Sequence, residues 1–185
     1  MTIKNKPKTK IIKQCLLCLT ITLSFQAHGQ VKQPQLDHDS IQYYMLEYIN
    51  VHRLNHKREK LIIHHKLNSA ANLHGEYMEY EKKLSHSQTN TSNPFYKGKT
   101  PTQRVGLSAG ENILYNWIDA SYTSKKIAQT LFNQWKSSPG HNNNMLSNVY
   151  TYFGFDCIIS KDTFRSGEEH ILYKIYGVQV FTKTI

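Results

Sequence analysis

Two histidines and one glutamate stand beside turns, where a chain can hold an ionisable side chain at the mouth of a core. His141 follows a helix-breaking Pro-Gly pair, His86 follows a helical pattern, and Glu111 lies between a glycine and an apolar run. If they converge, two imidazoles and one carboxylate could hold Zn²⁺ with an open fourth position, or could transfer protons without a metal. The simpler alternative for His141 is the end of a helix followed by a polar loop.

The other histidines have simpler interpretations. His52 and His56 are four residues apart on a predicted helix, a spacing that can ligate a metal, but no nearby carboxylate supplies a third ligand. His64 and His65 should point in opposite directions if that segment is extended. His74 lies on an apolar helical stripe, which predicts a hydrogen-bonded core histidine.

Amphipathic helices and strands must position these side chains. Apolar spacing predicts helices over residues 41–56, 66–83 and 124–135, with Asp37 or Ser40 as the cap of the first, and a short helix over 101–105. Strands are predicted over 110–115, 150–159 and 170–182, with residues 161–169 as a hairpin loop between the last two. Helices followed by antiparallel strands indicate the α+β class, with helices covering a sheet.

The N-terminal residues have the pattern of a secretory signal peptide over residues 1–29. Residues 1–13 carry five lysines and no acid, residues 11–25 are largely apolar, and Ala27 and Gly29 provide small residues before a cleavage point. The apolar run is shorter than the ~20 residues of a membrane span. We therefore expect a secreted protein without a transmembrane segment after cleavage, with a flexible lead-in over 30–39 and one domain over 40–185.

Charge and cysteine content narrow the possible functions. The formal net charge is +10, and cleavage after residue 29 would remove five lysines and leave +5. This modest charge suits an anionic envelope surface, and without a basic, aromatic-rich run it does not indicate nucleic-acid binding. Cys157 would be the only remaining cysteine, so no intramolecular disulfide is expected. Its apolar surroundings predict a buried, unreactive thiol.

Three motifs closely resemble those of the CAP superfamily, the cysteine-rich secretory, antigen five and pathogenesis-related proteins, also called SCP domains. They are Leu84-Ser85-His86, Ala109-Gly110-Glu111-Asn112-Ile113 and the run from Trp135 to Leu146, in the family's order and approximate spacing. Residues 46–53, 152–155 and 176–181 resemble the family's opening segment and last two strands. The resemblance covers residues 41–182 and is greatest to the disulfide-free bacterial branch.

This resemblance implies a three-layer α-β-α sandwich with a small antiparallel sheet between helices. It also implies a cleft lined by two histidines and two acids, which binds a divalent metal such as zinc in some members. By motif match, His86, Glu111 and His141 line the cleft, with His86 and His141 as the metal ligands. The second acid falls near Ser137 or Ser138, where this chain has no carboxylate.

Two functions remain open from the sequence. The first is a secreted, monomeric binding domain for a small ligand, a lipid, a peptide or an envelope component, with or without Zn²⁺. The second is a metal-assisted hydrolase in which His86 and His141 hold Zn²⁺ and Glu111 is the base. Glu111 and Asn112 could instead hold loops through backbone hydrogen bonds. The missing second acid favours binding.

Overall fold

The computed structural model describes residues 34–166 and 170–185, which belong to one compact unit. The proposed signal peptide, residues 1–29, and the first part of the lead-in lie outside the described residues. The elements are α1 (His38–Asn55), β1 (Ile62–Ile63), α2 (His65–Glu81), α3 (Pro101–Val105), β2 (Ala109–Asp119), α4 (Ser124–Lys136), α5 (Pro139–Leu146), β3 (Tyr152–Ser166) and β4 (His170–Thr182). No helix among these residues is long and apolar enough to span a membrane.

Helix α1 starts a few residues before its apolar stripe. Asp37 is the cap, and its carboxylate accepts a hydrogen bond from the Ser40 amide at 3.2 Å. The stripe Ile41, Met45 and Ile49 is fully buried, as the spacing predicted. The first turn is further tied to the sheet, because His38 Nδ1 lies 2.6 Å from the buried carboxylate of Asp156.

The sheet has the strand order β1-β3-β4-β2, with β2 and the short β1 at its two edges. Strands β2, β4 and β3 pair antiparallel, and the two residues of β1 add a parallel edge to β3. Cys157 on β3 is fully buried and unbridged, as predicted, and burial raises the pKa of its thiol well above the usual value.

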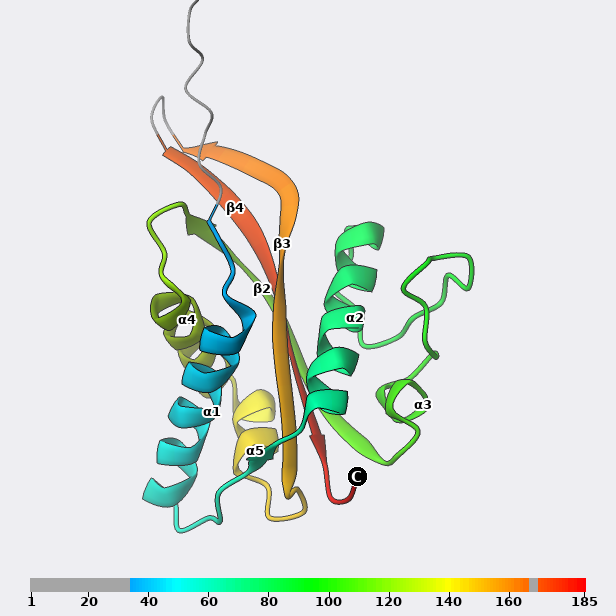
Figure 1. Cartoon of the computed structure of the whole chain (residues 1–185), viewed down its shortest axis with the longest axis vertical. Coiled ribbons are helices and arrows are strands. Elements are labelled where there is room, and N and C mark those ends of the chain that lie inside the picture. The colour runs from blue at the N-terminus through cyan, green and yellow to red at the C-terminus, as the bar shows by residue number, and fades with distance from the viewer. Residues whose placement is uncertain (1–33, 167–169) are drawn as a thin grey trace, which may run out of the picture. The chain divides into compact units, whose positions relative to one another are not determined.

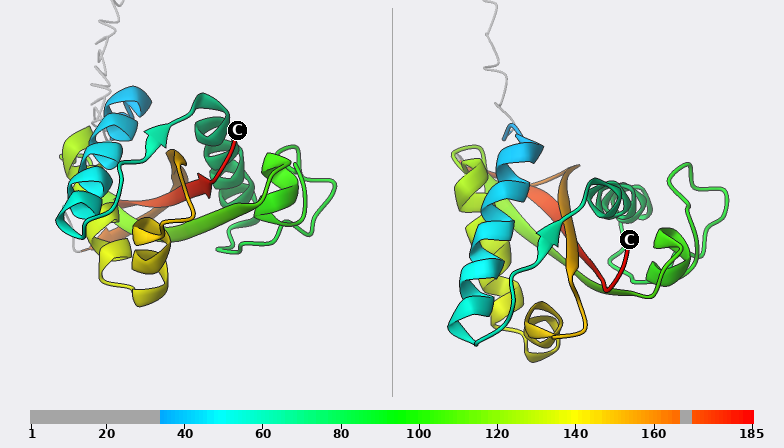
Figure 2. Two further views of the ribbon diagram at one scale, coloured as in Figure 1. Left: turned by 90° about the horizontal axis from the view of Figure 1, so that it is seen from below. Right: turned by 60° about the horizontal axis from the view of Figure 1, so that its bottom comes forward.

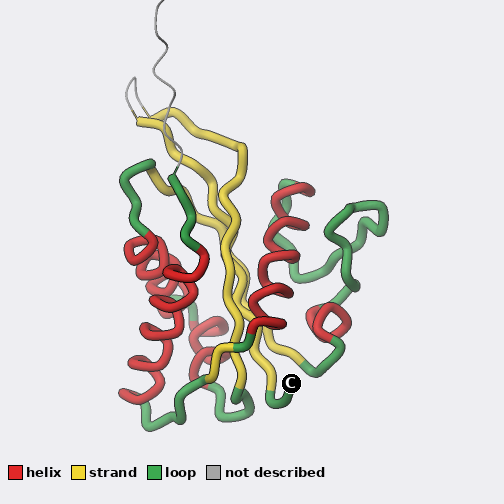
Figure 3. The backbone as a smooth tube through the Cα atoms, in the orientation of Figure 1, coloured by secondary structure: helices red, strands yellow, loops and turns green. Residues whose placement is uncertain are grey.

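The prediction of a loop over residues 161–169 was wrong for its first six residues. Strand β3 continues to Ser166, and Phe164 pairs with Leu172 of β4 after a register shift between Ile159 and Thr163. The irregularity takes up residues 160–162, and pairing resumes beyond it. The long β3–β4 pair extends past the helix ends (Figure 3).

Helices cover both faces of the sheet, which gives the expected three layers and confirms the α+β class. Helices α2 and α3 lie on one side, and α1, α4 and α5 lie on the other (Figures 1 and 2). Helix α2 packs against β3 at Gly154, where an added Cβ atom would stand 2.2 Å from the Leu67 backbone. Trp135 of α4 is fully buried in the larger apolar cluster on the opposite side.

Candidate functional site

Glu111 lies near the start of β2, which is an edge strand of the sheet and pairs with β4. Side chains alternate along a strand, so Glu111 faces α2 and Asn112 faces α5. Glu111 is only 7% exposed. His86 Nδ1 lies 2.9 Å from its Oε1, and Arg104 Nη2 donates to its Oε2. Both carboxylate oxygens are therefore engaged.

Arg104 is a site residue that the sequence analysis missed. It lies in α3, which is fixed by a capping box between Thr100 and Gln103. Its Nη1 also donates to the backbone carbonyls of His86, at 3.0 Å, and Lys99, at 3.4 Å. One buried guanidinium thus holds Glu111 and the backbone of the turn that carries His86. The available signal was a strongly capped short helix directly before the motif that contains Glu111.

His74 of α2 is fully buried, as predicted, but it also belongs to this charged network. Its Nε2 lies 3.6 Å from Glu111 Oε1, and its Nδ1 lies 3.1 Å from Gln88 Nε2. The Lys97 amide donates to Gln88 Oε1 at 2.8 Å, so the Gln88 NH₂ group must face His74. His74 therefore accepts on Nδ1 and carries its proton on Nε2, toward Glu111.

Burial and charge set the protonation states of this network. Burial lowers the pKa of His74 to about 4, in spite of the neighbouring Glu111. Burial alone would raise the pKa of Glu111, but the hydrogen bond from His86 and the positive charge of Arg104 outweigh it and lower that pKa. At neutral pH, Glu111 is therefore ionised and His74 is neutral.

His86 is the exposed member of the network, with 53% of its side chain accessible. An ionised carboxylate only accepts hydrogen bonds, so Glu111 fixes the proton of neutral His86 on Nδ1. The lone pair of neutral His86 is then on Nε2, the nitrogen that Glu111 does not use. This is the arrangement in which a carboxylate orients a histidine for an external partner.

His141 lies in the first turn of α5 and is half-buried. Burial lowers its pKa, and a positive charge on His86 lowers it further. The structure brings His86 into contact with Glu111, and it ties the backbone of His141 to Asn112, the next residue of β2. In the described part of the chain, no three His, Cys, Asp or Glu side chains are arranged to hold a metal ion.

Asn112 positions the helix that carries His141. Its Nδ2 donates to the His141 carbonyl at 3.0 Å and to Gln179 Oε1 at 2.9 Å. Asn144 Nδ2 donates to Asn112 Oδ1 at 2.8 Å and to the Glu111 carbonyl at 3.3 Å. Residues 139–146 are therefore a docked helix and not a free loop, and Asn112 has the structural role that the sequence left open.

The position of the absent second acid is taken up by a helix junction. Ser137 ends α4 and its hydroxyl donates to the Asn133 carbonyl at 2.9 Å. Ser138 precedes α5 as its cap residue and makes no side-chain capping bond. These serines connect two helices and supply no carboxylate to the site.

The remaining histidines lie elsewhere. His52 Nε2 is 2.8 Å from Asn142 Oδ1, and His56 Nδ1 donates to the His52 carbonyl at 2.8 Å, so each ring has one nitrogen committed within the fold. The expectation that His64 and His65 diverge was wrong, because their rings stack with centroids 4.6 Å apart. The segment is not extended throughout: His64 caps α2 and His65 begins it.

Comparison with known proteins agrees with this architecture. The model of the cysteine-rich secretory protein family, CAP, matches residues 46–181. A comparison with curated proteins found no match. An extracellular SCP-domain protein of Bacillus anthracis aligns with a TM-score of 0.52 and 20% identity, over 80% of this chain and 41% of that one. The chain therefore spans less than half of that protein's length.

Two further structures are similar. An outer surface protein of Borrelia burgdorferi has a TM-score of 0.51 and 12% identity, over 79% of this chain and 94% of that one. NaASP2, solved with Zn²⁺, has a TM-score of 0.49 and 14% identity, over 82% of this chain and 84% of that one. The family match covers most of the chain, and the first two structures share its fold, so this protein belongs to the CAP superfamily.

Proposed function

We propose that this CAP domain is a secreted ligand-binding protein in which His86 and His141 contact the ligand at the edge of β2. Glu111 and Arg104 support His86 from beneath and do not react themselves. The observation that carries this proposal is the engagement of both Glu111 oxygens, one by His86 and one by Arg104. The most exposed member of the network, His86, is the one oriented for a partner.

The same observation makes the hydrolase alternative weaker. A general base needs an oxygen within reach of the proton that it takes and a pKa near the working pH. Glu111 has a lowered pKa and is buried beside a guanidinium. Freeing one oxygen would require breaking a buried ion pair, which costs several kcal/mol by order of magnitude.

The donor set fits weak binding of Zn²⁺. His86 is oriented by a carboxylate in the way that metal-binding histidines are, and the lowered pKa of His141 keeps its ring neutral at pH 7. Two imidazoles are fewer than the three or four protein ligands of established zinc sites. Bound Zn²⁺ would supply a Lewis-acidic attachment point for an oxygen or nitrogen atom of the ligand.

Export is part of the proposal. The residue pattern of 1–29 predicts a signal peptide, and two proteins with the same fold are described as extracellular or outer-surface proteins. After cleavage the charge of +5 would favour an anionic partner. We therefore favour a small anionic ligand or an envelope component, a lipid or peptide included, bound by a monomer.

Calorimetric titration of the protein starting at Gln30 with Zn²⁺ tests the site. We expect weak binding by the wild type, and at least about tenfold weaker binding, or about 1.4 kcal/mol, in His86→Ala and in His141→Ala. His56→Ala is the matched control and should bind like the wild type. Identical isotherms for the wild type and both site variants would rule out these histidines as the ligands.

A hydrolysis assay separates the two functions. Ester, peptide and nucleic-acid substrates are offered to the wild type and to Glu111→Gln, with circular dichroism to confirm that the variant is folded. Binding without catalysis predicts no turnover by either protein. Turnover by the wild type that is lost in folded Glu111→Gln would establish Glu111 as a catalytic base and overturn the proposal.

A further inference from the structure

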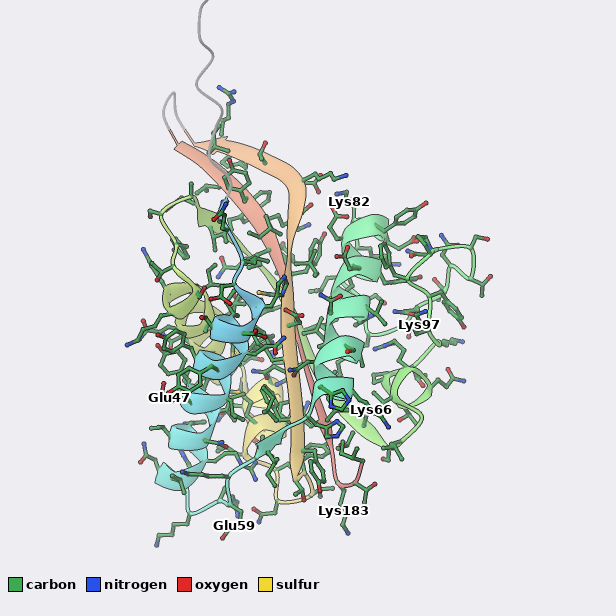
Figure 4. All side chains as sticks on the ribbon, in the orientation of Figure 1. Glu47, Glu59, Lys66, Lys82, Lys97 and Lys183 are labelled. Carbon is green, nitrogen blue, oxygen red and sulfur yellow. The ribbon has the colours of Figure 1, made fainter. Side chains whose placement is uncertain are left out.

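The face of the sheet that α2 covers continues beyond the end of that helix. Helix α2 ends beside Ser160 of β3, where the Lys82 ammonium lies 3.1 Å from the Ser160 hydroxyl oxygen (Figure 4). Strands β3 and β4 continue past this point (Figure 1). The side chains on this part of the face are therefore not covered by α2.

Aromatic side chains occupy the uncovered part of the face. Tyr115 and Trp117 of β2 share this face with Glu111, since alternate residues of a strand lie on the same side. Phe164 of β3 lies beside them, with its ring centroid 6.1 Å from that of Trp117 and the two planes inclined by 58°. Tyr115 is 44% exposed and Phe164 is 55% exposed. These rings are thus open to a partner.

A lysine without an acidic partner lies among these rings. Lys174 of β4 is the register partner of Trp117, and its ammonium lies 4.6 Å from the ring centroid of Tyr115 and 4.8 Å from that of Tyr176. Within the described ranges, no carboxylate is at salt-bridge distance from this ammonium. Two aromatic faces hold the charge in place and leave it for an anion. We call Tyr115, Trp117, Phe164 and Lys174 the aromatic platform.

The edge of β2 is less suited than this face to binding a partner. An added strand would need free backbone groups along that edge. The Trp117 amide already donates to Asn116 Oδ1 at 2.7 Å, and Gln134 Nε2 donates to the Tyr115 carbonyl at 3.4 Å. A partner of this region should therefore bind to the rings and not extend the sheet.

The platform suits a sugar chain that carries an acidic group. The face of a pyranose ring presents polarised C–H groups, which pack on the negative face of an aromatic ring and leave the hydroxyls in water. A membrane surface is a poorer match, because the sequence between β3 and β4 contains Glu168 and Glu169 in place of apolar residues that could enter lipid. A single-stranded nucleic acid needs a positively charged groove along its backbone, whereas the platform carries the one charge of Lys174.

We propose that the aromatic platform binds an acidic polysaccharide. Sugar rings pack on Trp117 and Phe164, and a carboxylate of the chain pairs with Lys174. The inference does not rest on the proposed function, because the platform lies beyond the end of α2 and uses none of the site residues His86, Glu111 and His141.

Tetragalacturonate is the probe, and cellotetraose is a tetrasaccharide without charge. Both are titrated into the protein starting at Gln30 and followed by calorimetry and by amide shifts in NMR spectra. Trp117→Ala and Phe164→Ala should each weaken binding of both sugars at least about tenfold, because each removes a packing surface. Lys174→Gln should weaken tetragalacturonate binding about fivefold, the size expected of an exposed charge pair, and leave cellotetraose binding unchanged.

Two variants on the opposite side of the sheet are matched controls. Tyr43 of α1 is an exposed aromatic residue, at 61%, and Lys125 of α4 has its ammonium 5.6 Å from the ring centroid of Tyr44. Tyr43→Ala and Lys125→Gln therefore remove an exposed ring and a ring-bound lysine that the proposal does not use. Both variants should bind tetragalacturonate like the wild type.

Several results would overturn the inference. One is no binding of tetragalacturonate by the wild type at millimolar concentration, and another is wild-type affinity in folded Trp117→Ala and Phe164→Ala. Tighter binding of oligothymidylate, or of phosphatidylglycerol vesicles, would assign the platform to a nucleic acid or a membrane surface. A dimer that Trp117→Ala dissociates would assign it to a second copy of the chain. Because Phe164 is exposed, Phe164→Ala tests the platform even if Trp117→Ala does not fold.

Discussion

Glu111 and Asn112 are neighbours on β2, yet the sheet separates them into two different polar networks. Glu111 faces α2, where the Arg104 guanidinium and the His86 imidazole bond its two oxygens and the His74 ring lies 3.6 Å away. Asn112 faces α5 and is held by neutral amides and a backbone carbonyl. The first network ends in a half-exposed histidine, whereas the amide of Asn112 itself is fully buried.

This difference indicates a division of roles between the two faces of the strand. The charged network sets protonation and orients His86 toward solvent, so it should respond to pH. The amide network contains no titratable side chain and fixes the position of α5, and with it His141. Substitutions in the charged network should therefore change how stability depends on pH. Substitutions in the amide network should lower stability by the same amount at every pH.

The largest loss of stability is expected from Arg104→Met. It removes the charge beside Glu111 and leaves a buried carboxylate without its counter-ion, which should cost about 3–5 kcal/mol of unfolding free energy. Urea unfolding at pH 7 measures this loss.

The double variant Arg104→Met/Glu111→Met provides the matched comparison. With both charges removed, most of the stability should return, because no buried charge is left unpaired. A double variant as unstable as Arg104→Met alone would show that Arg104 acts through its other hydrogen bonds and not through Glu111.

The next largest loss of stability is expected from the protonation of His74 as the pH falls. Its folded pKa of about 4 lies below the usual 6.5, so the unfolded chain takes up the proton first as the pH falls. The stability contributed by neutral His74 is complete above pH 6.5 and is lost as the pH falls toward 4. At 1.36 kcal/mol per pKa unit, the loss is about 3 kcal/mol.

Urea unfolding of the wild type and His74→Gln between pH 7 and 4.5 isolates this contribution. The window stops near the usual pKa of Glu111, whose lowered value adds acid sensitivity of the same sign at lower pH. Other histidines with lowered pKa values are common to both proteins. Parallel stability curves for the two proteins would contradict the assignment to His74.

A smaller effect is expected on the amide face. Asn112→Ala leaves buried partners without hydrogen bonds and should cost about 1–3 kcal/mol, by the same amount at pH 7 and pH 5. Asn116→Ala on the same strand is the control. Its amide donates to Gln134 at 3.0 Å in a more exposed setting and should change stability by about 0.5 kcal/mol or less. A cost for Asn112→Ala that varies strongly with pH would link the two networks.

Local sequence patterns were sufficient for much of the fold. The buried stripe of α1 and the stripe of α4 that ends at Trp135 follow from apolar spacing. The long β3 was underestimated, because pairing after residues 160–162 depends on a partner strand and not on local residue preference. The layering of helices on the sheet needed only the order of the elements.

The site was predictable only in part. Motif resemblance selected His86, Glu111 and His141, and the structure brings the first two into direct contact. Arg104 and His74 were missed because a charge partner is chosen by tertiary packing, and neither residue lies in the matched motifs. The sequence left Glu111 as a possible general base, whereas in the structure it is ionised and both of its oxygens are already paired.

The burial of Cys157 determines how the folded protein reacts with oxidants and thiol reagents. Its sulfur is buried on a central strand, with a thiol pKa raised by burial, so little of the reactive thiolate forms in the folded state. A reagent reaches this sulfur only when the sheet opens. The rate at which this thiol is labelled therefore reports opening of the sheet. While the domain stays folded, the thiol does not take part in disulfide exchange.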